Sequence, residues 1–216
     1  MQSEISKQEL QHANMNSSLA RGALVHISGL LFVFLAQFIG GFLISIYAFM
    51  IAASFLLYSQ IIIINQKRLV KWERLISSKS NTENTTENDI IKRPFVGSFW
   101  FYFAFFITFI IFPLNIASAS CAILAVGDCL SGLVGRRFGK HKIIGNKSIE
   151  GSVVFLLSSF LVALIFISPL LAIIGAVIAM FVELITEQSL LKRKHANDNL
   201  LIPIIISIIL YLSALM

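Results

Sequence analysis

Three acidic side chains stand inside long apolar stretches of this chain. Asp128 is the only charged residue in segment 94–135. Glu183 and Glu187 are the only charged residues in segment 151–191. A carboxylate near the centre of a bilayer costs about 2.5–3.5 kcal/mol on insertion scales, so such a group faces a bundle interior or an aqueous cavity. The three acids are therefore the first candidates for chemistry.

Other polar side chains are expected at a similar depth. Asp198 and Asn199 open the last apolar segment, and His26 lies about one helical turn into the first. Asp128 and Glu183 each lie about two turns from the cytoplasmic end of their segments. These groups would gather in the inner leaflet, where a soluble substrate could meet a lipid.

Helical spacing places Asp128 on a face of small residues. Asp128, Ser131, Gly132 and Gly135 follow the i, i+3, i+4, i+7 pattern of one helix face. Small residues allow a backbone or a ligand to approach closely. The alternative is plain helix packing, with Asp128 satisfied by a neighbouring helix.

Glu183 and Glu187 are also one turn apart. Glu187 could pair with Lys192 or Lys194 at the membrane edge, and this structural interpretation competes equally with a functional one. Glu183 lies deeper in its apolar segment. It is therefore the better functional candidate of the two.

The segment GLVGRRFGKHKIIGNKSIEGS has the composition of a phosphate site. Such a site needs backbone N–H groups, fixed positive charge and often a helix N-terminus. Glycine permits close backbone approach, and Ser148 can cap the helix that follows. The other residues concerned are Gly132, Gly135, Gly139, Gly145, Arg136, Arg137, Lys140, Lys142 and Lys147. We interpret 135–151 as a phosphate-binding loop; the alternative is a basic connector between two helices.

Carboxylates near this loop could hold a divalent cation. Mg²⁺ prefers oxygen ligands and is usually bound by one or two carboxylates together with substrate phosphates. Asp128, with Glu183 or Asp198, offers such oxygens. The combination of acids and basic loop predicts nucleotide-dependent chemistry.

Two stretches resemble the signature of the CTP-dependent polyprenol and lipid kinases, the family of dolichol kinase and phytol kinase. The first is AVGDCLSGLVGRRFGKHKIIGNKSIEGS, residues 125–152. It is similar to the family pattern G-D-x-x-A-x-x-x-G-x-x-x-G, a basic stretch and then K-S-x-E-G-[ST]. The second is Glu183 followed by DNLLIP, residues 198–203.

The chain departs from the family pattern at three places. Ser131 stands where the family usually has Ala. The gap between Glu183 and Asp198 is several residues longer than usual. The N-terminal R-K-x-x-H element is matched only at His26.

The resemblance implies transfer of the γ-phosphate of CTP to the hydroxyl of a membrane lipid alcohol: a polyprenol, a phytol-like alcohol or a diacylglycerol. It implies Mg²⁺ as cofactor and Asp128, Glu183 and Asp198 as catalytic acids, with Asp128 and Asp198 at the metal. His26 is a candidate substrate contact. The nucleotide-binding residues implied are Gly132, Gly135, Gly139, Lys140, Lys142, Lys147, Ser148, Glu150, Gly151, Ser152 and Asn199.

Two other functions fit the same residues. One is a phosphatidate cytidylyltransferase, which makes a CDP-lipid from CTP. The other is a small ion- or proton-coupled transporter, although such a path would need ionisable groups through the full bilayer depth. A membrane scaffold without catalysis is a further alternative.

These side chains must be positioned by membrane helices. The chain has 216 residues, of which 57% are hydrophobic and 13% charged, whereas soluble domains carry about 25% charged residues. A membrane helix needs roughly 20 apolar residues. The sequence therefore predicts an all-α, polytopic bundle of about seven transmembrane helices forming a single integral membrane domain, 1–216. The expected helices are 23–41, 43–64, 96–113, 115–134, 152–168, 170–190 and 199–216, with turns at Gly40-Gly41, Pro113 and Pro169.

The basic residues indicate the orientation of this bundle. All 17 Lys and Arg residues fall in the polar N-terminal segment 1–21 and in the loops 65–95, 135–151 and 191–198. Seven helices put these segments on one side, which the positive-inside rule makes cytoplasmic. The net charge of +6 is thus explained by topology, and no nucleic-acid motif accompanies it. The expected partners are a membrane lipid and CTP; the lipid and the oligomeric state are not encoded in any readable pattern.

This orientation predicts that three glycosylation motifs are inaccessible to the lumenal enzymes of a eukaryotic host. The N-x-[ST] sites at Asn16, Asn84 and Asn146 all lie on the predicted cytoplasmic side. We expect no change in gel mobility on glycosidase treatment after expression in such a host. A glycan at any of the three would contradict the orientation.

Overall fold

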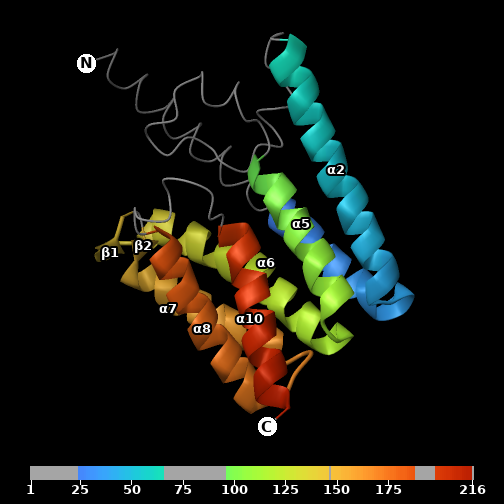
Figure 1. The fold of residues 1–216 in the computed structure, drawn as a ribbon. Helices are drawn as coiled ribbons and strands as arrows, with labels where there is room; N and C mark the ends of the chain where they lie inside the picture. Colours follow the sequence, from blue (N-terminus) through green and yellow to red (C-terminus); the bar gives the residue numbers. More distant parts are fainter. Residues whose placement is uncertain (1–23, 66–95, 146, 188–197, 216) are drawn as a thin grey trace, which may run out of the picture.

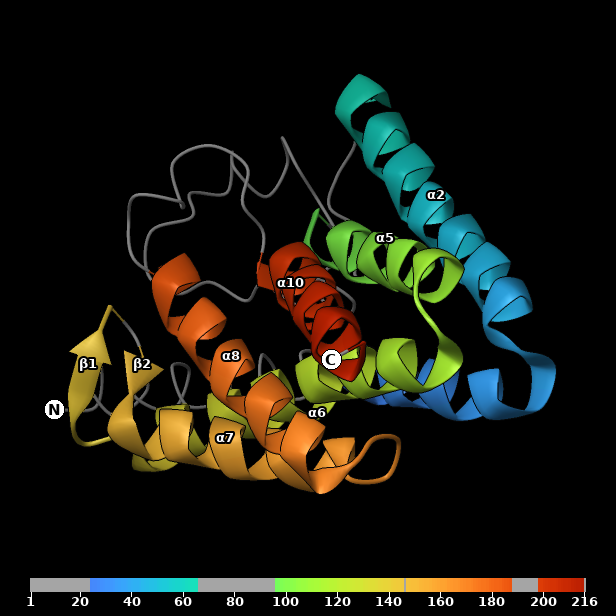
Figure 2. The ribbon, with the colours of Figure 1, turned by 60° about the horizontal axis from the view of Figure 1, so that its bottom comes forward.

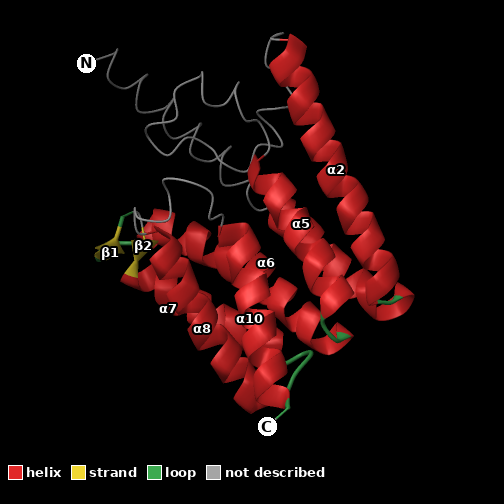
Figure 3. Ribbon diagram, viewed as in Figure 1, coloured by secondary structure: helices red, strands yellow, loops and turns green. Residues whose placement is uncertain are grey.

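The computed structural model describes residues 24–65, 96–145, 147–187 and 198–215. Within these ranges the protein is an all-α bundle of seven helices with one short β-hairpin (Figures 1 and 3). The predicted fold class is therefore confirmed. In chain order the helices are Leu24–Ile39, α2 (Gly41–Asn65), α5 (Val96–Ile111), α6 (Leu114–Phe138), α7 (Ile149–Ala163), α8 (Pro169–Glu187) and α10 (Asp198–Ala214).

Some predictions fall outside the described residues. They include the polar segment 1–21, the loop 66–95, the loop 191–197 and the pairing of Glu187 with a lysine of that last loop.

Glycine and proline mark the three predicted chain reversals. Gly40 has a φ of 87° between the first helix and α2, a left-handed conformation that glycine adopts readily. Pro113 is the N-cap residue of α6. Pro169 is the first residue of α8, where its fixed φ suits a helix start. The turns expected at these positions are confirmed.

The interval predicted as one loop, 135–151, is helical at both of its ends, so the predicted boundaries of this loop were wrong. α6 continues to Phe138 and α7 begins at Ile149. The glycines at 135 and 151 allow this because they bring the two helices together. A Cβ on Gly151 would lie 3.3 Å from the Cα of Gly135 and 3.2 Å from the Ser131 carbonyl oxygen.

A β-hairpin forms most of the remaining connection. β1 (Lys142–Ile144) pairs antiparallel with β2 (Lys147–Ser148), and Gly145 takes a φ of 55° at the turn. Strands this short contain too few residues to show the period-two alternation that marks a strand. The hairpin was therefore not predicted.

α6 forms the centre of the bundle. Its small and apolar side chains are buried from Ile116 to Ala125, because α5, α7, α8 and α10 pack around it (Figure 2). The buried residues are Ile116, Ala117, Ser118, Ala119, Ser120, Cys121, Ala122, Ile123, Leu124, Ala125, Gly127 and Ser131. Cys121 is completely buried in this core.

α2 lies at the edge of the bundle and packs against α5 (Figure 1). Its outward face carries large apolar side chains that are exposed, among them Phe42, Leu43, Tyr47, Met50 and Leu57. In the described part of the chain, three helices are long and apolar enough to cross a membrane: Gly41–Ile61, Leu114–Phe138 and Pro169–Thr186. The four other described helices are apolar but shorter. An apolar outer surface around a helical core is the arrangement that a lipid environment requires.

The close packing of α6 on α7 predicts that Gly127 tolerates no side chain. A Cβ there would lie 2.5 Å from Ser159 Oγ and 3.0 Å from a Phe155 ring carbon. We expect Gly127→Ala to lower the free energy of unfolding by about 1–3 kcal/mol, the usual cost of overpacking, measured by unfolding in detergent micelles. Gly132→Ala is the control, because it gains the same helix propensity and meets only the end of Arg136, at 3.3 Å. Equal stability of the two variants would contradict this packing.

Candidate functional site

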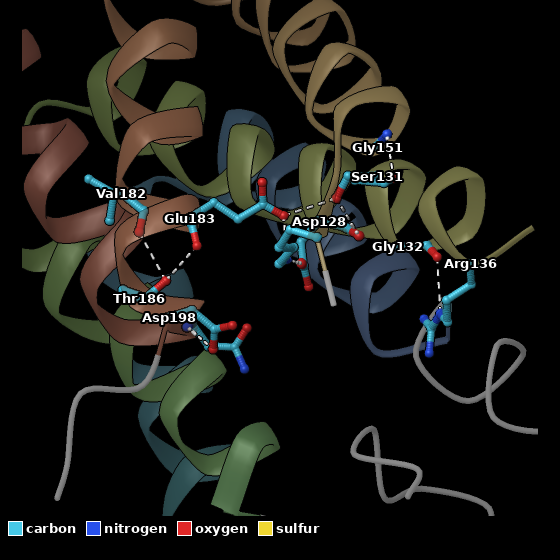
Figure 4. A network of polar contacts seen from close by, with 12 residues as sticks. Asp128, Ser131, Gly132, Arg136, Gly151, Val182, Glu183, Thr186 and Asp198 are labelled. Atoms are coloured by element: carbon cyan, nitrogen blue, oxygen red, sulfur yellow. Dashed lines mark hydrogen bonds and ion pairs between the residues drawn. The ribbon is translucent and has the colours of Figure 1, made fainter. Parts of the chain in front are cut away.

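Four segments bring ionisable side chains together near the hairpin end of the bundle. His26 comes from the first helix, Asp128 and Ser131 from α6, Lys147 from β2 and Glu183 from α8. We call these five residues the buried ion-pair cluster. Figure 4 shows Asp128 and Ser131 on α6 facing the Glu183 side chain. The cluster thus joins parts of the chain that are far apart in sequence.

Glu183 is the deepest member of the cluster. Its side chain is 1% exposed. Its Oε1 accepts hydrogen bonds from Lys147 Nζ at 2.5 Å and from Ser131 Oγ at 3.2 Å. Its Oε2 is buried and has no hydrogen-bond partner among the described residues. A buried carboxylate with one oxygen unsatisfied is costly unless a further group joins it.

Asp128 occupies the more accessible side of the cluster. Its Oδ2 lies 3.1 Å from His26 Nε2, and its Oδ1 lies 3.9 Å from Lys147 Nζ. The Asp128 side chain is 26% exposed, so it can be reached from outside while Glu183 cannot. His26 is buried with its ring edge-on to Phe101 at 5.5 Å. The pair therefore ties the first helix to α6 and aligns the carboxylate.

Lys147 reaches this depth from the hairpin. β2 ends at Ser148, which packs against Gly135 of α6. Gly135 lies about two helical turns beyond Asp128 in the same helix. The long apolar stem of lysine can lie along helix surfaces while its ammonium finds a charged partner. Lys147 is 23% exposed at its side chain, and it bridges the acids of α6 and α8.

The cluster keeps Lys147 charged. Burial lowers the pKa of this lysine, but the carboxylates of Asp128 and Glu183 outweigh that effect, with a smaller contribution from Asp198, and raise its pKa above 10.5. A group with a raised folded-state pKa stabilises the fold fully below its unfolded pKa and loses this contribution as pH rises through the folded value. The stabilisation by Lys147 is thus complete at neutral and mildly alkaline pH.

Two backbone N–H groups in the first turn of α7 are bonded within the protein. Ser148 caps the helix, as predicted, because its Oγ accepts from Gly151 N at 3.2 Å. The N–H of Ile149 donates to the His141 carbonyl at 2.9 Å. The Glu150 carboxylate accepts from the His141 backbone N–H at 3.3 Å and lies 2.8 Å from His141 Nδ1. In this conformation Glu150 is the anion at the hairpin, so a phosphate here would have to displace or adjoin it.

Three of the predicted phosphate glycines serve packing. Gly135 and Gly151 face each other, and Gly139 ends α6 with its N–H donating to the Gly135 carbonyl at 3.2 Å. Gly132 differs, because a Cβ there would meet only Arg136. The Arg136 Nε donates to the Gly132 carbonyl at 3.0 Å. Gly132 is the glycine of this set that borders the cluster through its neighbour Ser131.

The other predicted nucleotide-binding residues are distributed around the cluster. Lys140 and Lys142 are exposed at the hairpin. Ser152 is buried, and its Oγ has no hydrogen-bond partner among the described residues. The Asn199 Nδ2 donates to the Gly97 carbonyl at 3.4 Å, toward α5.

Asp198 opens α10 beside the cluster. Its Oδ1 accepts from the Asn199 backbone N–H at 3.0 Å. Figure 4 shows it below Glu183, and its charge acts on Lys147. Asp198 therefore lies within electrostatic range of the cluster, while its hydrogen bond is to the backbone of its own helix.

Two contributors were not predicted as site residues. Ser131 donates to Glu183, and its position one turn from Asp128 was the available signal. His141 binds Glu150 through the hairpin. No spacing rule indicated that pairing, because it depends on the strand register.

The oxygen ligands fit a divalent cation that is shared with a substrate. Among the described residues, no three His, Cys, Asp or Glu side chains are close enough to hold an ion on their own. Mg²⁺ commonly takes one or two protein carboxylates and completes its shell with water and phosphate oxygens. Asp128 and the unsatisfied Glu183 Oε2 are groups of the right chemistry. Binding of Mg²⁺ by Asp128 and Asp198 stays a prediction.

The cluster can in principle do two kinds of chemistry. A carboxylate held by a histidine, such as Asp128 with His26, can accept a proton from a hydroxyl group. An ammonium in a low-dielectric site can stabilise negative charge that develops on a nearby oxygen. The two groups are neighbours, because Lys147 Nζ lies 3.9 Å from Asp128 Oδ1 and also contacts Glu183 Oε1.

The ion pair predicts strong coupling between Lys147 and Glu183. Lys147→Met removes the cation that pairs with Glu183 and one of the two partners of Asp128, and we expect it to lower the free energy of unfolding by ~3 kcal/mol. The double variant Lys147→Met/Glu183→Gln removes the uncompensated charge. It should therefore lose less stability than the sum of the two single variants, measured by unfolding in detergent micelles. Additive losses would contradict a direct pairing.

Comparisons with known proteins indicate no activity for this chain. No protein-family model matches the chain, and no solved structure matches it. The chain is 28% identical over 196 residues to an uncharacterized protein of Rickettsia prowazekii (strain Madrid E), an alignment that covers 84% of this chain and 87% of that relative. The similarity extends over most of both proteins, and the function must be argued from the site.

Proposed function

We propose that the protein is a CTP-dependent kinase that transfers the γ-phosphate of CTP to the hydroxyl of a membrane lipid alcohol. The observation that carries this proposal is the meeting of Asp128, Lys147 and Glu183, from three elements, at one buried position. Buried charges of this kind in an apolar bundle are functional candidates, because they are expensive to maintain. The motif resemblance of segment 125–152 supports the same chemistry.

The cluster has the parts that phosphoryl transfer needs. This reaction depends mainly on positioning and on electrostatic stabilisation of the transferred group. The lipid hydroxyl would lie against Asp128, the accessible acid, and Asp128 held by His26 would receive its proton. The hydroxyl oxygen then bonds to the γ-phosphorus as the bond from that phosphorus to the β–γ bridging oxygen breaks, and CDP leaves.

Basic side chains at the hairpin would hold the triphosphate. Lys147 faces the acids, and Arg136, Lys140 and Lys142 surround the same end of the bundle. A phosphate at α7 would compete with Glu150 for the groups around the helix N-terminus. Mg²⁺, when bound at Asp128 and Asp198, would neutralise charge on the β- and γ-phosphates.

The proposal includes an orientation in the membrane. The helices would cross it as a multi-pass bundle, with the hairpin and the N-terminus on the cytoplasmic side. CTP is then available from the aqueous phase. The lipid alcohol arrives along the apolar outer surface, where side chains such as Leu130 and Leu133 of α6 are exposed near Asp128.

The test is phosphate transfer by the purified protein in lipid vesicles. Vesicles containing a polyprenol, a phytol-like alcohol or a diacylglycerol are incubated with Mg²⁺ and CTP labelled either at the γ-phosphate or in the base. We expect γ-label in one of the lipids. Asp128→Asn should lower the rate by about 10²-fold or more, the usual loss of an acid–base group.

Ser54→Ala is a matched control for this assay. Ser54 lies on the exposed part of α2, and its hydroxyl donates to the Met50 carbonyl of the same helix, so the variant should keep full activity. Base label in the lipid would instead indicate cytidylyl transfer and would overturn the kinase proposal. Ion uptake by the vesicles without lipid labelling would favour a transporter.

A further inference from the structure

The Lys147 ammonium lies between two carboxylates, where a metal cation could also bind. Its Nζ lies 2.5 Å from Glu183 Oε1 and 3.9 Å from Asp128 Oδ1, and these acids come from different helices. Asp198 adds a third negative charge within electrostatic range. One ammonium therefore acts on three acids, and of these Asp128 is also paired with His26 at 3.1 Å.

A second observation is a buried carboxylate oxygen that no described residue satisfies. The Glu183 side chain is almost completely buried, and its Oε2 has no hydrogen-bond partner among the described residues. Figure 4 shows this side chain directed from α8 toward Asp128 and Ser131. A divalent cation is bound through carboxylate oxygens and waters, and it could engage the oxygen that the ammonium leaves unsatisfied.

We propose that Lys147 holds a divalent-cation position between Asp128 and Glu183, and that nucleotide phosphates open this position by drawing the ammonium away. The assignment of Glu183 as a metal ligand follows from this geometry. The identity of the displacing anion rests on the proposed function. The competition between the ammonium and a divalent cation does not rest on the proposed function.

The physical reason is charge exclusion. An ammonium and a divalent cation repel each other strongly in a bundle interior, where the effective dielectric constant is low. Both cannot occupy the space between Asp128 and Glu183. A triphosphate at the hairpin offers Lys147 new anionic partners, so the lysine can leave without losing its charge pairing. Metal and nucleotide binding then favour each other, and by linkage the effect is reciprocal.

The test measures Mn²⁺ binding without nucleotide, by electron paramagnetic resonance on the purified full-length protein. We expect Lys147→Met to bind Mn²⁺ at least tenfold more tightly than the unmodified protein, because the competing ammonium is gone. The double variant Lys147→Met/Glu183→Gln should lose this gain. Arg137→Met is the control for net charge, because Arg137 is exposed and stacks on Phe138 rather than on the acids. Its Mn²⁺ affinity should equal that of the unmodified protein.

The stability of Lys147→Met gives a second readout. Mn²⁺ should raise its melting temperature, because a cation that binds only the folded state stabilises it. Equal Mn²⁺ affinity in Lys147→Met and the unmodified protein would overturn the proposal, as would equal affinity in the single and double variants. A Lys147→Met protein that unfolds and is not rescued by Mn²⁺ would also overturn it. Failure of the lipid-labelling assay leaves these nucleotide-free results intact, so the two proposals fail separately.

Discussion

An ammonium group and a buried carboxylate, whose side chain is only 1% exposed, can both lie inside an apolar bundle because their charges neutralise each other. In this protein the pair is Lys147 and Glu183, and Asp128 completes it from the central helix. Three separate elements must therefore be in place before either charge is stable in the bundle. The short hairpin, the continuation of α6 to Phe138 and the serine cap of α7 all serve to deliver one lysine to this depth.

The same pairing explains why glycines are concentrated on the last turns of α6. The hairpin can place Lys147 over Asp128 only if α7 starts close against α6, and glycines at 135 and 151 permit that approach. Ser148 then fills the gap between the helices while it caps α7. Packing and chemistry thus use neighbouring residues. Gly135 and Gly151 position the site by letting α7 approach α6.

Much of this architecture could be predicted from the sequence, because long apolar stretches and their punctuation by Gly40, Pro113 and Pro169 reflect local physics. The cost of burying Asp128 and Glu183 also indicated that they would seek partners. The loop boundaries were mispredicted since glycine usually weakens a helix, whereas here tertiary packing keeps residues 135–138 helical.

Which partners would meet was less predictable, because the contacts depend on helix rotation and on hairpin register. His141 with Glu150 and Ser131 with Glu183 are such cases. Lys147 was expected to bind phosphate. In the structure it pairs with the carboxylates of two acids. Its position makes the lysine a link between the acids of the bundle and an anion at the hairpin.

A structure of the protein in a lipid nanodisc with CTP and Mg²⁺, determined by electron cryomicroscopy, tests this account most directly. The account predicts the triphosphate at the hairpin end of α6 and α7, with the Lys147 ammonium within hydrogen-bond distance of a phosphate oxygen and no longer on Glu183. A triphosphate bound elsewhere on the molecule, with Lys147 still paired to Glu183, would contradict it.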